Sequence, residues 1–241
     1  MNKFICCNSL KNITDKSVKS YQRGGDNKMN SEFRDSENIV LKSRKVLLRP
    51  FIREDVEKRL EWKPYPDPLY FHYNMPEMTE DQKEAWYLKR KSDLCALWLS
   101  IDDMGGQLVG FICLYKIEPK TKTAWVGIYL GYEFIDQGMG TDAMLTLLRY
   151  YFGEMQFELL FLDVASHNKR AIRCYQKCGF EFIRKKYSDH DPRMNIDIFG
   201  DERFKEVRGY FIKEGKRVLV EFDEMETSKE SWIKTKMSFV G

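Results

Sequence analysis

The sequence contains no apolar run that approaches the length of about 20 residues needed to cross a bilayer. Near the N-terminus, the apolar stretch at residues 4–7 is too short for the hydrophobic core of a secretory signal peptide. Both absences argue against a membrane protein or an exported one. We therefore expect a cytoplasmic protein with no membrane partner.

The sequence also lacks C-x-x-C pairs, low-complexity segments and a large excess of charge of one sign. The 6 cysteines include no C-x-x-C pair, so we expect neither a zinc knuckle nor a disulfide framework, and no bound metal. The net charge is only +3, and residues 1–42, with 8 Lys and Arg against 5 Asp and Glu, account for all of it. A neutral remainder gives no reason to expect a nucleic-acid partner.

The polar N-terminal segment, residues 1–42, has no hydrophobic periodicity, and we expect it to be a flexible extension. Residues 43–241 are long enough to form one sizeable domain. Within it, residues 187–207 are polar and irregular, and we interpret them as an insertion before the last strands.

Hydrophobic patterns predict an α/β domain with a mixed parallel and antiparallel sheet flanked by helices. A strand–helix–strand sequence over 123–165 requires a parallel pair of strands, whereas the turns near residues 104 and 214 require antiparallel hairpins. The predicted strands are 46–50, 94–101, 107–116, 123–130, 158–165, 180–186, 209–213 and 217–225, and the predicted helices are 53–62, 79–92, 138–153 and 168–178.

The turn at residues 137–141 has the composition of an anion site. Gly138 and Gly140 leave the backbone N–H groups at a helix start unobstructed, and the helix dipole favours a pyrophosphate there. An ordinary helix start that needs glycine for close packing has the same pattern, so spacing alone leaves both interpretations open.

A dinucleotide-binding fingerprint is a competing interpretation of the same glycines. Gly138, Gly140 and Ala143 have its spacing, and Asp163 lies where an acid that binds ribose would be. Two features count against it: residues 131–137 separate the strand from the first glycine, and several strands precede this unit.

The segment from Asn168 to Phe180 resembles the N-x-x-A-x-x-x-Y-x-x-x-G-F signature of the GNAT acetyltransferase superfamily. Residues 124–131, followed by 138–141, look like the fourth strand and pyrophosphate loop of that superfamily. The opening at 46–55 resembles the branch that modifies ribosomal protein N-termini, polyamines and antibiotics. The resemblance covers about residues 43–225.

This resemblance implies an acyltransferase whose cosubstrate is acetyl-CoA. The family separates its fourth and fifth strands so that pantetheine inserts like an extra strand. It implies that Asn168 contacts the cofactor, although a helix cap is an equally good role, and that Tyr175 protonates the departing thiolate, although it could simply pack on a strand. The implied cofactor-binding residues are Ile128, Tyr129, Leu130, Gln137, Gly138, Met139, Gly140, Thr141 and Asn168.

Two departures from the family pattern concern charged side chains. Ile135 stands where the pyrophosphate loop often has Arg or Gln, and Trp125 stands where many members carry the Glu that helps to deprotonate the amine. A base would have to come from elsewhere, and Glu133, Asp136 and His167 are the candidates.

The sequence therefore predicts an N-acetyltransferase that acts on a primary amine, either a protein N-terminus or a small molecule such as a polyamine or aminoglycoside. The aromatic segment 62–73 would enclose this acceptor or form a packed lid over the sheet. The alternative is a GNAT-like protein that binds CoA without efficient catalysis. A monomer or a homodimer is expected.

Overall fold

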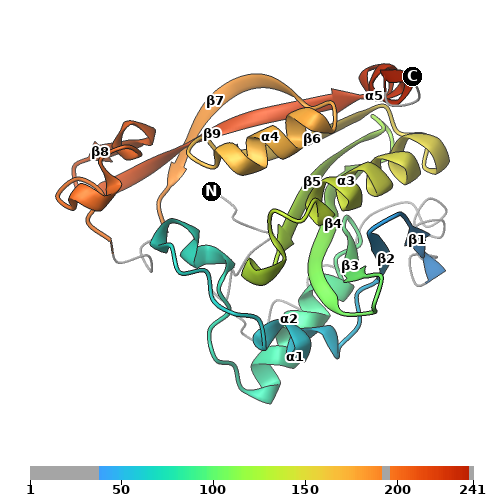
Figure 1. Cartoon of the computed structure of the whole chain (residues 1–241), viewed down its shortest axis with the longest axis horizontal. Helices are drawn as coiled ribbons and strands as arrows, with labels where there is room; N and C mark the ends of the chain where they lie inside the picture. The colour runs from blue at the N-terminus through green and yellow to red at the C-terminus, as the bar shows by residue number, and fades with distance from the viewer. Residues whose placement is uncertain (1–37, 192–195, 239–241) are drawn as a thin grey trace.

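The computed structural model describes residues 38–191 and 196–238 of the chain. Its centre is a mixed sheet in the order β1-β2-β3-β4-β5-β6-β9-β7, with β8 paired to β9 (Figure 1). The strands are β1 (Leu41–Lys42), β2 (Val46–Pro50), β3 (Leu97–Asp103), β4 (Leu108–Glu118), β5 (Thr123–Leu130), β6 (Leu159–Ala165), β7 (Glu181–Asp189), β8 (Phe211–Glu214) and β9 (Arg217–Ser228). The predicted mixed α/β fold is confirmed.

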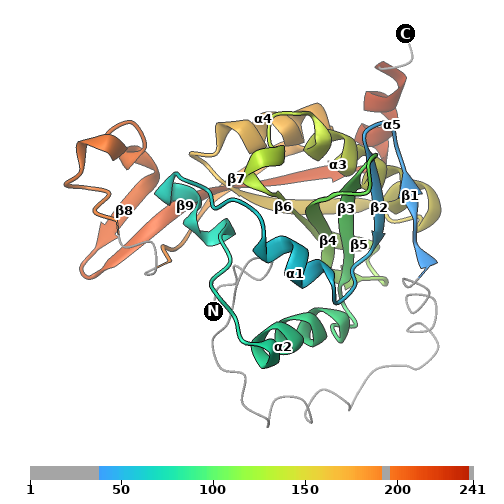
Figure 2. The same cartoon turned by 60° about the horizontal axis from the view of Figure 1, so that its bottom comes forward.

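Helices cover both faces of this sheet. One face carries α3 and α4, and the other carries α1 and α2 (Figure 2). The bounds are α1 (Asp55–Leu60), α2 (Glu80–Lys91), α3 (Met139–Arg149), α4 (Lys169–Lys177) and α5 (Lys229–Ser238), and α3 continues into a π-helical turn at Tyr150–Glu154. Among the described residues, no helix combines the length and apolar character required to cross a membrane.

Local sequence signals fix the ends of two helices. Thr79 and Gln82 form a reciprocal capping box at the start of α2, in which each side chain accepts a bond from the backbone N–H of the other. At α4, the Asn168 side chain accepts from the Ala171 N–H at 3.2 Å, and Gly179 ends the helix in the left-handed region at φ +86°. The predicted cap at Asn168 is confirmed.

The parallel pair in the middle of the sheet separates after a short contact. β5 and β6 pair only through residues 123–125 and 159–161, whereas β5 remains paired to β4 as far as Leu130. β6 pairs instead along its whole length with β9. The outer halves of β5 and β6 therefore diverge and leave a gap in the sheet, as the family resemblance implies.

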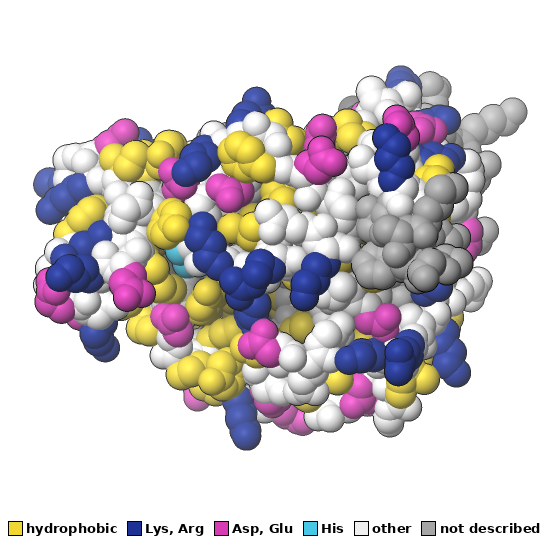
Figure 3. Space-filling model, turned by 45° about the horizontal axis from the view of Figure 1, so that its top comes forward, with side chains coloured by type: hydrophobic (Ala, Val, Ile, Leu, Met, Phe, Trp, Pro, Cys, Tyr) yellow, Lys and Arg dark blue, Asp and Glu magenta, His cyan; other side chains and the backbone are white. Residues whose placement is uncertain are grey.

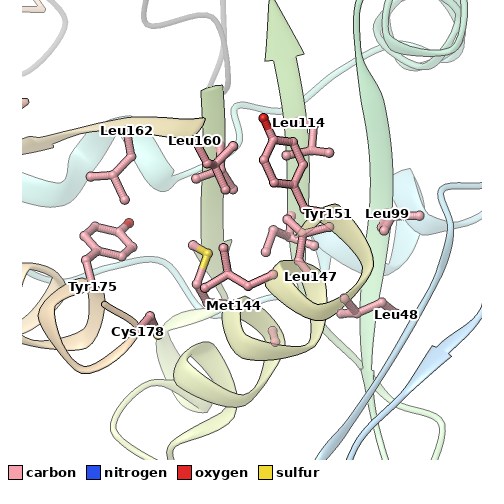
Figure 4. Close-up of a cluster of buried hydrophobic side chains, with 14 of the residues drawn as sticks. Leu48, Leu99, Leu114, Met144, Leu147, Tyr151, Leu160, Leu162, Tyr175 and Cys178 are labelled. Carbon is pink, nitrogen blue, oxygen red and sulfur yellow. The ribbon is translucent and has the colours of Figure 1, made fainter. Parts of the chain in front are cut away.

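The main core fills the space between the sheet and the helices α3 and α4. Figure 4 shows side chains from the strands, among them Leu48, Leu114 and Leu160, packed beside Leu147 and Tyr151 from the helix layer. The opposite face has its own apolar cluster, made by Phe51, Val56, Trp86, Leu108, Phe111 and Tyr129. Because both faces are buried, the strands stay in a fixed register on either side of the gap.

A buried ion-pair network joins the start of α1 to the sheet. Arg49 bonds to Asp55 at 2.7 Å and to Asp102 at 2.6 Å, and Ser100 donates to Asp55 at 2.6 Å. Burial alone would raise the pKa of Asp55, but the bonds from Arg49 and Ser100 outweigh it and lower that pKa. This network fixes where the chain leaves β2 for the aromatic segment.

The predicted division of the chain stays a prediction. Most of the proposed extension, residues 1–37, lies outside the described residues, although β1 already belongs to the sheet. Within the proposed insertion, β7 continues to Asp189, and the part at 196–207 packs with Leu69, Phe211 and Val220 in a small apolar cluster. Strand β9 was predicted only as far as Met225, and helix α5 was not predicted.

Candidate active site

Two adjoining cavities meet at the gap between β5 and β6. We call the first, of ≈ 310 Å³, the loop cavity, because Gly138, Gly140 and Thr141 line it together with basic side chains of α4. The second, of ≈ 200 Å³, is the aromatic cavity, lined by ring side chains such as Tyr70, Tyr73 and Tyr129 and by Asp163. Both cavities are lined by Tyr73, Ile128, Tyr129, Asn168, Ala171 and Tyr175. These shared residues show that the two cavities adjoin.

The turn before α3 has the geometry of an anion site. Gly138 is the N-cap of α3 and has φ +78°, a conformation that side chains with a Cβ rarely adopt. The next backbone N–H groups belong to the first turn of the helix, where intrahelical acceptors are missing. Gly138, Gly140 and Thr141 line the loop cavity, whereas the predicted Gln137 and Met139 do not.

Lys45, which precedes β2, brings a positive charge to this turn. Its Nζ donates to the Gln137 carbonyl at 2.8 Å, and its backbone N–H donates to Asp142 at 2.8 Å. Ser43 also donates to Asp142, at 2.5 Å. The sequence showed Ile135 in place of a loop cation and missed Lys45, because this contact joins residues 92 positions apart.

Further basic side chains surround the loop cavity. Arg170, Arg173 and Lys177 of α4 line it, and Figure 3 shows Lys and Arg side chains gathered on the face that carries α4. Together with the free N–H groups of the turn, they suit a ligand with several phosphate groups. The residues present therefore fit the cofactor that the family resemblance implies.

Asn168 and Tyr175 lie on α4, where the two cavities join. Asn168 is 4% exposed and caps the helix while lining both cavities. Tyr175 is 9% exposed, packs its ring edge against Phe180 at 6.0 Å and lies beside Leu162 (Figure 4). Each residue thus has a packing or capping role and also reaches the cavities.

Trp125, at the position of the missing acid, packs on the face opposite α4. Its ring lies 5.5 Å from Phe161 and 6.3 Å from Tyr115. Asp163 follows Phe161 by two positions on β6 and so points to the same face. It lines the aromatic cavity, where burial raises its pKa although an ion pair with Lys186 opposes that shift.

Sequence analysis did not consider Asp163 as a base and weighed it only as a ribose ligand. The signal was present in the alternation along 158–165: Leu160, Leu162 and Val164 point into the core with α3 and α4, which leaves Asp163 on the other face. The sequence pattern did not show that β5 and β6 separate, and this separation opens the Asp163 face of β6 to a cavity.

The three bases expected from the sequence have different surroundings. Glu133 accepts from the Lys63 N–H at 3.2 Å and lines neither cavity, whereas Asp136 lines the loop cavity 3.9 Å from Arg170. His167 lines the aromatic cavity with its ring stacked on Phe211 at 5.7 Å. Burial lowers the pKa of His167 to about 4, so its imidazole is neutral at neutral pH and accepts a proton poorly.

The aromatic segment forms a wall of both cavities. Tyr70 and Tyr73 stack at 6.2 Å, and Tyr65 packs on Tyr73 at 5.3 Å. The Tyr65 hydroxyl donates to the Leu130 carbonyl at 2.9 Å, while Trp62 points into the core and donates to the Leu108 carbonyl at 3.2 Å. The segment therefore both packs as a lid and lines the cavities.

A sheet opened between parallel strands, with an anion-binding turn at one side, defines an acyl-CoA-dependent transferase. The family model of the acetyltransferase (GNAT) domain matches residues 45–181, which is more than half of the chain. The chain belongs to this GNAT acetyltransferase family. It is an acetyl-CoA-dependent N-acetyltransferase, and the dinucleotide-binding alternative is excluded.

Similar proteins agree with this family. The spermidine N(1)-acetyltransferase of Vibrio cholerae serotype O1 is 22% identical over 148 residues, which cover 61% of this chain and 81% of the relative. The spermine/spermidine N(1)-acetyltransferase of Bacillus subtilis (strain 168) is 25% identical over 104 residues, covering 43% and 66% of the two chains.

Solved structures share the fold at low identity. The spermidine N-acetyltransferase from Vibrio cholerae in complex with CoA and spermine is 18% identical, with a TM-score of 0.56 over 78% of this chain and 98% of that one. A GCN5-related N-acetyltransferase from Brucella melitensis is 16% identical, with a TM-score of 0.63 over 84% of each chain.

Replacing Lys45 tests whether its charge contributes to acetyl-CoA binding at the turn. Lys45→Ala should weaken acetyl-CoA binding roughly threefold at low ionic strength and less at high salt, because exposed ion pairs are worth ~0.2–1 kcal/mol and are screened. Calorimetric titration at two salt concentrations measures this. Gly138→Val should weaken binding more strongly, since a Cβ there would lie 3.1 Å from the Lys45 Nζ at a φ of +78°.

Arg44→Ala is the matched control, because Arg44 is an exposed neighbour that lines neither cavity. Acetyl-pantetheine, which lacks the phosphates, should bind the Lys45→Ala variant as well as the parent protein. Equal acetyl-CoA affinities of parent and variant at low salt would contradict a role for Lys45.

Proposed function

We propose that this enzyme transfers the acetyl group of acetyl-CoA to a primary amine of a polyamine. The observation that carries the proposal is an ammonium group already held in the aromatic cavity: the Lys186 Nζ, ion-paired with Asp163 and 5.0 Å from the centre of the Trp125 ring. A carboxylate beside an aromatic face is the environment that a cationic amine prefers.

Two further observations support a polyamine over other amines. Asp191 is a second carboxylate among the residues that line the aromatic cavity, and an acceptor with several ammonium groups needs several such partners. The two curated relatives are named as spermidine or spermine acetyltransferases.

Protein N-termini and aminoglycosides stay as alternative acceptors, and the cytoplasmic location and oligomeric state stay predictions.

The proposed chemistry uses both faces of the sheet. Acetyl-CoA supplies an acyl group activated as a thioester. Asp163, on the α1 face, is placed to accept a proton from the acceptor ammonium, so that the neutral amine can attack the carbonyl carbon. Tyr175, on the α4 face, is placed to donate a proton to the sulfur as the C–S bond breaks. The gap between β5 and β6 would bring the acid and the base to one reacting centre from opposite sides.

The loop side of the site would position the cofactor rather than react. Backbone N–H groups of 138–141, with Lys45 and the basic residues of α4, would hold the phosphates. The open edge of β5 at residues 128–130 would face the pantetheine arm. Because Tyr65 already donates to the Leu130 carbonyl, that carbonyl is partly satisfied by the protein itself.

Comparing acceptors tests the proposed function. Release of free CoA thiol should be fastest with spermidine or spermine, with kcat/KM at least about tenfold above that of a peptide N-terminus or an aminoglycoside, because unpaired charges in a matched site are costly. A preference for the peptide or the aminoglycoside would replace the polyamine. No thiol release with any amine would point to cofactor binding without catalysis.

Asp163→Asn tests the base. The variant keeps the shape of the side chain and cannot accept the proton, so kcat/KM should fall about 100-fold. Asp163 must be ionised to act, and burial raises its pKa, so the parent activity should decline with falling pH at a higher pH than an ordinary Asp would produce.

The groups that face this carboxylate are Lys186, Glu224 and Lys116. The acidic limb of the pH profile should disappear in Asp163→Asn. An unchanged limb, or full activity of the variant, would rule Asp163 out as the base.

Tyr175→Phe tests the acid. The change keeps the buried ring and removes only the hydroxyl, so the turnover number should fall about 100-fold while acetyl-CoA affinity holds. Calorimetry and steady-state kinetics separate the two quantities. Full turnover, with the chemical step shown to limit the rate, would leave solvent as the proton donor.

A further inference from the structure

Lys186 reaches the acceptor side of the sheet from β7. Across β9, Glu224 faces both Asp163 on β6 and Arg184 on β7. Lys186 lies two positions beyond Arg184 and so shares its face of the strand. Its Nζ forms an ion pair with Asp163 and lies 3.5 Å from Glu224. The lysine side chain therefore crosses β9 to the edge of the aromatic cavity, which it lines.

The Lys186 ion pair is not needed to neutralise the carboxylate of Glu224 on β9. Glu224 already has an ion pair with Arg184 at 2.9 Å, so the carboxylate on β9 has a partner without Lys186. The Lys186 side chain is 35% exposed and stays accessible from the cavity. A primary amine of the chain thus occupies the environment proposed for the acceptor amine, beside the same carboxylate and the same indole ring.

We propose that Lys186 is an acetylation site of the enzyme itself, modified in an intramolecular reaction when no external amine occupies the aromatic cavity. This inference rests on the proposed function, because it takes Asp163 as the base and Tyr175 as the acid.

The step is balanced without any further reactant. The Lys186 ammonium gives a proton to Asp163, and its nitrogen attacks the carbonyl carbon of the acetyl thioester to form the C–N bond. The C–S bond breaks, and the sulfur keeps the electron pair. The ammonium loses two protons: the first passes to Asp163 and then to solvent, and the second leaves the nitrogen after the attack and restores the Tyr175 hydroxyl, which has given its own proton to the sulfur. The products are an amide at Lys186 and free CoA.

Proximity explains why Lys186 is selected over neighbouring lysines. A reacting group held beside its partner gains the advantage of an intramolecular reaction over one in free solution. Lys185, the adjacent residue, bonds to Glu221 at 2.7 Å and does not line the aromatic cavity. Lys116 lies 4.2 Å from the centre of the Trp125 ring but is not among the cavity-lining residues either.

Mass spectrometry of the full-length protein with acetyl-CoA tests this. Without an amine acceptor, the protein should gain one acetyl group with first-order kinetics that do not depend on protein concentration, and peptide mapping should place it on Lys186. Lys186→Arg keeps the charge and should slow this single acetylation at least about tenfold. Lys185→Arg is the matched control and should acetylate like the parent.

Spermidine provides an internal check, because it should compete for the same cavity. Saturating spermidine should suppress the acetylation of Lys186 severalfold while acetylspermidine accumulates. If the protein turns over spermidine but leaves Lys186 unmodified when acetyl-CoA is supplied without an amine, or if modification spreads over Lys116 and other lysines at comparable rates, the inference is overturned and the proposed function stays intact. Absence of both reactions would overturn the two together.

Discussion

The divergence of β5 and β6 is the constraint on which the rest of this structure depends. The two strands are held together at residues 123–125 and 159–161 and are then drawn apart, β5 by β4 and β6 by β9. Backbone groups along the open edges need partners, and an inserted ligand arm can supply them. Asn168 and Tyr175 of the α4 region and Asp163 of β6 all line the aromatic cavity at this gap.

Charge is divided between the two sides of that gap. The α4 side offers helix N–H groups and basic side chains, which suit phosphates, and the α1 side offers carboxylates and aromatic faces, which suit ammonium groups. A lysine lies near each side of the gap: Lys45 contacts the turn before α3, and Lys186 lines the aromatic cavity beside Asp163. In the proposed reaction, the sheet would hold the phosphates of acetyl-CoA on one side and the ammonium groups of the acceptor on the other.

Local patterns predicted the elements near the site well. The bounds of β5 and the Asn168 cap follow from alternation and from capping chemistry, which act over a few residues. Three features were not predicted: the contact of Lys45 with the turn, the position of Asp163 in the aromatic cavity, and the placement of β9 between β6 and β7. Each depends on segments far apart in sequence, and on which face of a strand a cavity opens. One family motif indicated the cofactor loop, but no local rule could supply its added cation.

The gap between β5 and β6 also divides the sheet into two groups of strands that are paired to each other over only a few residues. One group runs from β1 to β5, and the other contains β6, β9 and β7, with β8 paired to β9. The paired residues near 124 and 160 lie beside the core under α3. A ligand arm that forms hydrogen bonds to both open strand edges would connect the two groups of strands, so that they open and close as one cooperative unit. Slow amide hydrogen exchange along both edges would then be a property of the loaded enzyme rather than of the polypeptide alone.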